Sequence, residues 1–283
     1  MSAHTPRVLL LGASGPLGGH LLERLPRSFP TVAALGRGGL AGADDRVQWL
    51  PMHVDAANPK MIGSLLDAAC ADVIVNAIAA SPRSDPASMA QVNAQFPRAL
   101  ADAATGRGSR VLQISTDGVF SGARGDYSED DCPDPVDEYG RSKLEGELAG
   151  SHLTIRTSFF GRSRRGTGLV DWLIAQRGQT VDGFVDYRFT GMAASLLADL
   201  IASAIEQALA GVYHVGGDPL TKYDLLCAAS QRLKLDINVR PVSRGAVDRT
   251  LDARKFFDAV GRRPPTVAES VEALTPCGVL SRS

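Results

Sequence analysis

The sequence lacks the features that mark membrane proteins, disulfide-stapled scaffolds and nucleic-acid binders. No apolar run reaches the ~20 residues that a membrane helix requires. The four cysteines stand apart from one another and from the five histidines, so we expect neither a disulfide framework nor a metal site. With 30 basic and 31 acidic residues, the chain has no charge excess that favours nucleic acid or an anionic membrane. Residues Met1–Arg7 contain no signal-peptide core, and we expect a cytoplasmic protein.

Short apolar runs alternate with amphipathic segments of helical length through the first half of the chain. Runs rich in Val, Ile and Leu that are each followed by a crossover are typical of parallel strands buried on both faces. Right-handed crossovers then predict an α/β fold with a doubly wound parallel sheet of the Rossmann type. The predicted strands are 7–11, 31–35, 47–52, 73–78, 111–114, 153–157 and 211–215, and the predicted helices are 17–25, 61–69, 87–104, 193–209 and 223–234.

A glycine-rich turn follows the first predicted strand. Gly12, Gly15 and Gly18 form a GxxGxxG pattern between that strand and a helix. Gly12 suits the tight turn, Gly15 lets the backbone approach a diphosphate, and Gly18 permits close packing of the helix on the sheet. The helix N-terminus attracts phosphate, and Pro16 fits its first turn. We interpret the turn as a dinucleotide site, the alternative being a turn without a ligand. The predicted cofactor contacts are Gly12, Ser14, Gly15, Pro16, Leu17 and Gly18.

Residues after the next strands bear on the kind of dinucleotide. The second strand ends at Arg37 instead of an acidic residue. A carboxylate there would bind the ribose 2′-hydroxyl, whereas a guanidinium pairs with a 2′-phosphate, so Arg37 favours NADP over NAD. The alternative is a solvated loop arginine. Asp55 either holds the adenine amino group or caps a helix. Ala77 ends the fourth strand, beside the predicted cofactor, and is assigned to its site.

Tyr139 and Lys143 are four residues apart, so they share one face of a helix. A phenol is a poor acid–base catalyst at neutral pH, and a nearby ammonium is expected to lower its pKa toward the working range. Thr116 follows the fifth strand, where its hydroxyl can hold a substrate carbonyl. We predict a catalytic trio of Thr116, Tyr139 and Lys143, with the tyrosine and the lysine also at the cofactor. The alternative is a solvated Tyr–Lys pair.

Several segments resemble the extended short-chain dehydrogenases/reductases, and among them the dTDP-4-dehydrorhamnose reductase group. ISTDGVFSG at Ile114–Gly122 is similar to the STDYVFDG of that group. GDYSEDDCPDPVDEYGRSKLEGE at Gly125–Glu147 resembles its Tyr-x-Glu-x-Asp, proline and YGxSKxxGE pattern. RTSFFG at Arg156–Gly161 resembles its RTS segment. Later segments at Phe189–Ile205 and Gly211–Leu226 are also similar to the group.

The resemblance implies a dinucleotide-binding domain at 1–155 and a substrate-binding lobe at 156–283, with some segments returning to the sheet. It places the substrate at Asp117, Gly118, Ser158 and Phe159. Two departures fall where the sugar would be recognised. Gly118 stands where the group has an aromatic residue, and VDYRFTG at Val185–Gly191 replaces Asp-Gln-x-Gly-x-Pro-Thr. The departures favour a sugar other than 4-keto-rhamnose.

The function implied by the resemblance is NADPH-dependent reduction of a nucleotide-linked 4-keto-6-deoxy sugar, in surface polysaccharide or glycoside biosynthesis. The carrier is dTDP, UDP or GDP, and a homodimer is possible. Arg162, Arg164 and Arg165 either meet a diphosphate or are solvated. Two alternatives stay open. One is a non-catalytic NADP-binding subunit similar to the beta subunit of methionine adenosyltransferase, and the other is a nucleotide-sugar epimerase.

Overall fold

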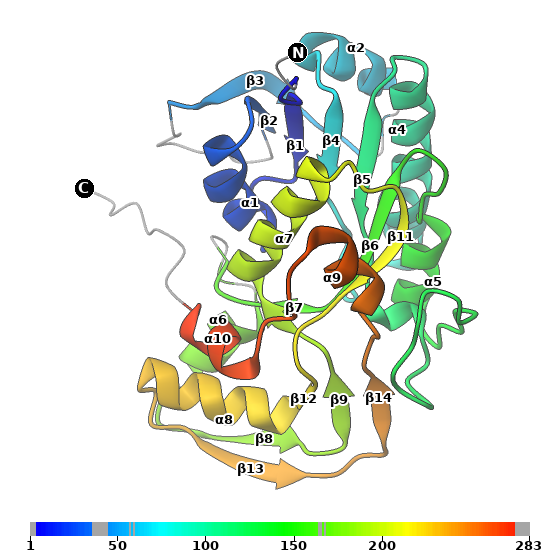
Figure 1. The fold of residues 1–283 in the computed structure, drawn as a ribbon. Coiled ribbons are helices and arrows are strands. Elements are labelled where there is room, and N and C mark those ends of the chain that lie inside the picture. The colour runs from blue at the N-terminus through cyan, green and yellow to red at the C-terminus, as the bar shows by residue number, and fades with distance from the viewer. Residues whose placement is uncertain are drawn as a thin grey trace.

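The largest element is a parallel sheet of seven strands, in the order β11-β6-β5-β4-β1-β2-β3 (Figure 1). The computed structural model describes residues 4–35, 45–56, 58, 60–163, 166 and 168–274. The order is that of a doubly wound sheet with one added edge strand, so the predicted Rossmann fold is confirmed. The strands are β1 (Val8–Leu11), β2 (Thr31–Leu35), β3 (Val47–His53), β4 (Val73–Asn76), β5 (Arg110–Ile114), β6 (Leu153–Thr157) and β11 (Gly211–Val215).

The sheet is covered on both faces, and its strands β1 and β4 are buried at every position. In β1, Val8 and Leu10 point to one core, whereas Leu9 and Leu11 point to the other. The first core is closed by α1 (Gly18–Arg24), α7 (Ala194–Glu206) and α9 (Arg254–Val260), and the second by α2 (Lys60–Ala69) and α4 (Phe96–Thr105) (Figure 1). Alternation of side chains along a strand therefore builds two cores from one apolar run.

The segment predicted as one helix over 87–104 is divided into three parts. They are α3 (Pro86–Met89), a π-helical turn (Ala90–Gln95) and α4. Pro97 has no N–H, so the carbonyl of Asn93 loses its usual helical donor. That carbonyl instead faces Gly146, where an added Cβ would lie 1.8 Å from it. The Asn93 amide donates to Ser142 Oγ at 3.0 Å, which ties this turn to α5 (Glu138–Glu145).

A smaller lobe lies beyond one end of the large sheet (Figure 1). It packs on its own apolar cluster, which includes Phe189 and Leu225. Of its elements, the sequence predicted only α8, because the others are short and interrupted by polar residues. The elements are β7 (Phe159–Phe160), α6 (Leu169–Ala175), β8 (Thr180–Phe184), β9 (Tyr187–Phe189), β10 (Met192–Ala193), β12 (Leu220–Thr221), α8 (Lys222–Leu233), β13 (Asn238–Val242), β14 (Val247–Arg249) and α10 (Val267–Glu272). The division at residues 155 and 156 stays a prediction.

Replacing Gly18 by alanine tests the packing of α1 on the glycine turn. An added Cβ would lie 1.9 Å from the carbonyl oxygen of Gly12, so backbone must move. We expect Gly18→Ala to destabilise the protein by about 1–3 kcal/mol, as overpacking does. Gly63, inside α2, is the matched control because its added Cβ would meet Arg107 at an ordinary 3.5 Å.

Gly63→Ala should leave the protein unchanged or stabilise it by up to about 1 kcal/mol through helix propensity. Urea unfolding of both variants measures the difference. Equal unfolding free energies for Gly18→Ala and the wild type would contradict the tight packing of this turn.

Candidate functional site

The glycine turn folds back on itself between β1 and α1. Gly12 has φ +84°, and a Cβ on it would lie 2.8 Å from the carbonyl of Ala77 at the end of β4. The N–H of Gly15 donates to the Gly12 carbonyl at 2.8 Å. Position 18 must also be glycine, because a Cβ there would lie 1.9 Å from the same Gly12 carbonyl oxygen. The backbone at Gly12 and Gly18 is thus glycine-dependent because of packing within the protein, and Ala77 lies where the sequence placed it.

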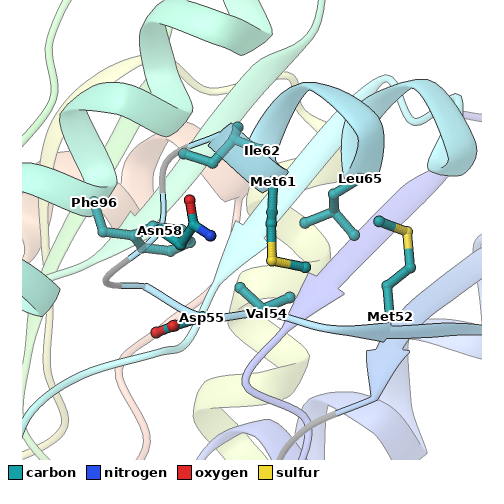
Figure 2. Close-up of a pocket in the computed structure, with 8 residues that line it drawn as sticks. All are labelled: Met52, Val54, Asp55, Asn58, Met61, Ile62, Leu65 and Phe96. Carbon is teal, nitrogen blue, oxygen red and sulfur yellow. The ribbon is translucent and has the colours of Figure 1, made fainter.

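A pocket opens at the end of β3 (Figure 2). Met61 and Leu65 of α2 line it together with Val54 and Met52 from the end of β3, and Asp55 is its carboxylate. The complete lining is Met52, Val54, Asp55, Asn58, Met61, Ile62, Leu65 and Phe96. A mostly apolar slot with two polar side chains, Asp55 and Asn58, is typical of a site for a heteroaromatic ring.

Two expectations near this pocket have different outcomes. At the start of α2, Asn58 Oδ1 accepts from the N–H of Lys60 at 3.2 Å. Asp55 lines the pocket, and its two predicted roles, adenine contact and helix cap, both stay predictions. Arg37, the residue predicted to select NADP, lies outside the described residues, as do Arg164 and Arg165. Arg162 is described, and its guanidinium lies 3.6 Å from Asp171.

The turn after β5 holds Thr116 in a fixed position. Its Oγ accepts from the N–H of Gly118 at 3.1 Å and donates to Asp117 Oδ1 at 3.2 Å. Asp117 is buried, and Ser158 also hydrogen-bonds its side chain. Burial raises the pKa of Asp117, and the charges of Lys222 and Arg249 oppose that shift.

The structure therefore brings together the predicted residues Thr116, Asp117, Gly118 and Ser158. Phe159, the fourth predicted substrate residue, begins β7 and is only half-buried. Its ring packs against the core beneath the sheet. It adjoins Ser158 in the chain but makes no hydrogen bond that would orient a substrate.

Helix α5 crosses the end of β5 and carries Tyr139 and Lys143. Asp137 caps it by accepting from the N–H of Gly140 at 2.7 Å. A Cβ on Gly140 would lie 2.2 Å from the Gly118 carbonyl, so helix and turn are in direct contact. Lys143 is 3% exposed, and its Nζ donates to the Ile114 carbonyl at 2.5 Å. The two residues thus lie at the edge of the sheet that also carries Thr116 and the glycine turn.

The pKa values in this site run against one expectation. Burial raises the pKa of Tyr139 to about 12, and the carboxylates of Asp117 and Asp137 add to the shift. Burial lowers the pKa of Lys143 to about 8, against the opposing charge of Glu147. The expected lowering of the phenol pKa was wrong, because burial disfavours the phenolate and the carboxylates of Asp117 and Asp137 add to that effect. At neutral pH the phenol is protonated and suited to donate a proton.

A buried ion pair joins the end of α5 to the sheet, and it was not predicted from the sequence. Glu147 accepts from Arg156 at 2.8 Å and from Ser115 Oγ at 2.7 Å, and the two charged side chains are 9% and 6% exposed. Arg156 also lies 3.3 Å from His214 Nε2, and burial lowers the pKa of that histidine to about 4. The network joins the segments after β5 and α5 to β6 and β11. The only signal in the sequence was a charged residue inside the apolar strand β6.

Two cationic residues of the smaller lobe also reach the site. Lys222 begins α8, and Arg249 ends β14. Both charges act on Asp117. Neither residue was predicted for the site, although Lys222 lies in the segment Gly211–Leu226 that resembles the family. Both contact Tyr187, which lies in the segment flagged as a departure.

Other site types find little support in the part of the chain that is described. There, no three His, Cys, Asp or Glu side chains are grouped to hold a metal ion. No described helix has both the length and the apolar character to cross a membrane.

Comparisons with known proteins place the chain among sugar-nucleotide enzymes. A curated probable dTDP-4,6-dihydroxy-2-methyloxan-3-one 4-ketoreductase of Streptomyces antibioticus is 31% identical over 272 residues, covering 90% of this chain and 86% of the relative. The dTDP-4-dehydrorhamnose reductase of Salmonella typhimurium is 34% identical over 235 residues, covering 77% and 75%. The methionine adenosyltransferase 2 subunit beta of Xenopus tropicalis is 27% identical over 301 residues, covering 95% and 87%.

Solved structures share the fold. A dTDP-4-dehydrorhamnose reductase of Bacillus anthracis in complex with NADP superposes with a TM-score of 0.78 at 23% identity, covering 95% of this chain and 98% of that one. The family model described as the RmlD substrate binding domain matches residues 6–255. That match spans both the large sheet and most of the smaller lobe. The chain therefore belongs to the RmlD substrate binding domain family.

Proposed function

We propose that the protein is an NADPH-dependent reductase of a nucleotide-linked 4-keto-6-deoxy sugar, acting in surface polysaccharide or glycoside biosynthesis. The observation that carries the proposal is the placement of Tyr139 and Lys143 on α5, in contact with the turn that holds Thr116. Membership of the family and the similarity to two sugar-nucleotide ketoreductases support it. A cytoplasmic location and a homodimer are parts of the same proposal.

The residues present suit a pyridine dinucleotide. When bound, NADPH supplies a hydride for the carbonyl carbon. The turn from Gly12 to Gly18 and the neighbouring Ala77 would hold the diphosphate, at the N-terminus of α1, where backbone N–H groups and the helix dipole attract phosphate. The apolar pocket with Asp55 would hold the adenine. Lys143 would donate to the nicotinamide ribose.

The trio at the end of β5 would then handle the oxygen of the ketone. Thr116 would donate its hydroxyl hydrogen bond to that oxygen in place of Asp117. Tyr139 would give the proton, and its raised pKa keeps that proton on the phenol until an alkoxide develops. Lys143 would hold the ribose and place positive charge near the developing anion. The same residues serve oxidation, so the direction rests on the family likeness.

A non-catalytic partner protein is the second candidate, and the similarity to the methionine adenosyltransferase beta subunit favours it. Both candidates use the dinucleotide site, so cofactor binding does not separate them. NADPH oxidation measured with a panel of keto-sugar nucleotides, beside co-purification of a partner enzyme, does separate them. An epimerase would instead purify with tightly held dinucleotide and turn over without added cofactor.

Replacing Tyr139 by phenylalanine tests the proton donor. The variant keeps the ring but loses the proton, so we expect kcat to fall about 100- to 10,000-fold. NADPH affinity, measured by fluorescence titration, should stay near the wild-type value. Tyr213→Phe is the matched control because that ring packs on Phe256 in a different part of the molecule. A Tyr139→Phe enzyme with wild-type turnover would exclude the tyrosine as the acid.

The pH dependence of NADPH affinity tests Lys143. Its pKa of about 8 means that the ammonium is present below that pH and lost above it. Affinity should therefore fall as the pH rises through about 8. Tyr139 does not ionise in this range because its pKa is about 12.

Lys143→Met is the control for this titration. It should bind NADPH more weakly and show no step near the lysine pKa. A wild-type affinity that stays flat through that range would contradict a role for Lys143 in holding the cofactor.

A further inference from the structure

We infer that Lys222 and Arg249 form a recognition site for an oxyanionic group of the substrate, beside the reacting carbonyl. The inference rests on the proposed function and deepens it, because it names residues that select the substrate. Both residues come from the smaller lobe, and the charges of both act on Asp117, which directly follows Thr116. The guanidinium of Arg249 also lies beside Gly118. A substrate whose ketone binds at Thr116 would therefore present its neighbouring groups to these two cations.

Lys222 is a half-buried cation that lies over two aromatic rings. Its Nζ lies 3.8 Å from the centre of the Phe189 ring and 5.1 Å from that of Tyr187. Among the residues that the structure describes, no hydrogen-bond acceptor or ion-pair partner meets it. Rings stabilise an ammonium through cation–π contact but leave its N–H groups without acceptors. Burial lowers the pKa of Lys222, the charge of Asp117 raises it, and Arg249 lowers it further.

Arg249 is also incompletely satisfied. Its side chain is 13% exposed, and its Nε is buried without a hydrogen-bond partner. Its Nη1 makes only a long hydrogen bond of 3.4 Å to the Tyr187 hydroxyl. Its Nη2 lies 4.0 Å from Asp137, a carboxylate that is half-exposed. Two neighbouring cations thus share the buried carboxylate of Asp117 and the distant one of Asp137.

Gly118 makes room for this arrangement. A Cβ on Gly118 would lie 3.5 Å from Nη1 of Arg249 and 3.3 Å from Thr116 Oγ. An aromatic side chain at this position would extend into the space of the guanidinium. Gly118 and Arg249 are therefore coupled. A larger side chain at position 118 would occupy the space that the Arg249 guanidinium now fills.

An oxyanion is the ligand that this site requires. Two half-buried cations repel each other, and a group with several negatively charged oxygens accepts hydrogen bonds from both at once. A neutral hydroxyl would accept a hydrogen bond from only one of the two cations, and it would not reduce the repulsion between them. Two groups have this chemistry, namely the diphosphate of a nucleotide sugar and a carboxylate on the sugar ring.

Calorimetric titration of the full chain, loaded with NADP, tests the site with stable ligands. The probes are dTDP, UDP, UDP-glucose and UDP-glucuronate, and the variants are Lys222→Met and Arg249→Met. Loss of one charge-assisted hydrogen bond corresponds to a Kd about 10- to 100-fold higher. Lys255→Met is the matched control because Lys255 also lies over a ring, that of Tyr213, outside the site. Lys222→Arg should restore most of the affinity.

The pattern of losses identifies the oxyanion. If it is the diphosphate, both variants weaken all four ligands alike. If it is a sugar carboxylate, they weaken UDP-glucuronate and leave UDP unchanged. Gly118→Tyr should reproduce the loss seen with Arg249→Met, since it displaces the same guanidinium.

Wild-type Kd values in both methionine variants, with unchanged melting temperature, would overturn the inference, as would a wild type that binds none of the four ligands. Failure of the proposed reductase function is separate, because it would show as absent NADPH oxidation while these binding differences persist.

Discussion

The site depends on the close contact between α5 and the turn after β5. Gly140 lies against the Gly118 carbonyl, and Gly146 lies against that of Asn93, so the helix touches backbone on two sides. No residue with a Cβ fits at either glycine without moving main chain. The helix is thereby fixed along its length, and the Lys143 hydrogen bond to Ile114 adds a polar anchor between the two contacts. Packing of backbone on backbone, more than any side-chain interaction, sets where the phenol of Tyr139 lies.

Fixing Tyr139 there also fixes its chemistry. The phenol is held in a buried region with Asp117 and Asp137, and both carboxylates oppose its ionisation. Lys143 lies on the same face of the helix, but burial lowers the pKa of its ammonium, so its positive charge is less stable there. The balance keeps the proton on oxygen, which suits donation to an alkoxide better than abstraction from an alcohol. A bound oxidised nicotinamide would add positive charge and shift this balance, so the residues are compatible with both directions.

The first half of the fold was predictable because its strands are apolar on both faces and its motifs are local. The glycine turn, the pairing of Tyr139 with Lys143, and Thr116 at the end of β5 all follow from short spacings in the chain. The smaller lobe was not predictable in this way, because its strands β8 and β13 are partly exposed and mix polar with apolar residues. The raised pKa of Tyr139 also escaped prediction, because its main cause is burial and its second cause is Asp117, and the topology, not the spacing, determines both.

The two departures from the family pattern, Gly118 and the segment 185–191, lie close together in the structure. Gly118 lies against Arg249, and Tyr187, within the altered segment 185–191, contacts both Arg249 and Lys222. These two departures lie where the smaller lobe meets the end of β5. Residues at that junction are distant in the chain, and each is tolerable only in the company of the others. A change of substrate would involve both positions, because a large side chain at 118 and the guanidinium of Arg249 compete for the same space beside Thr116.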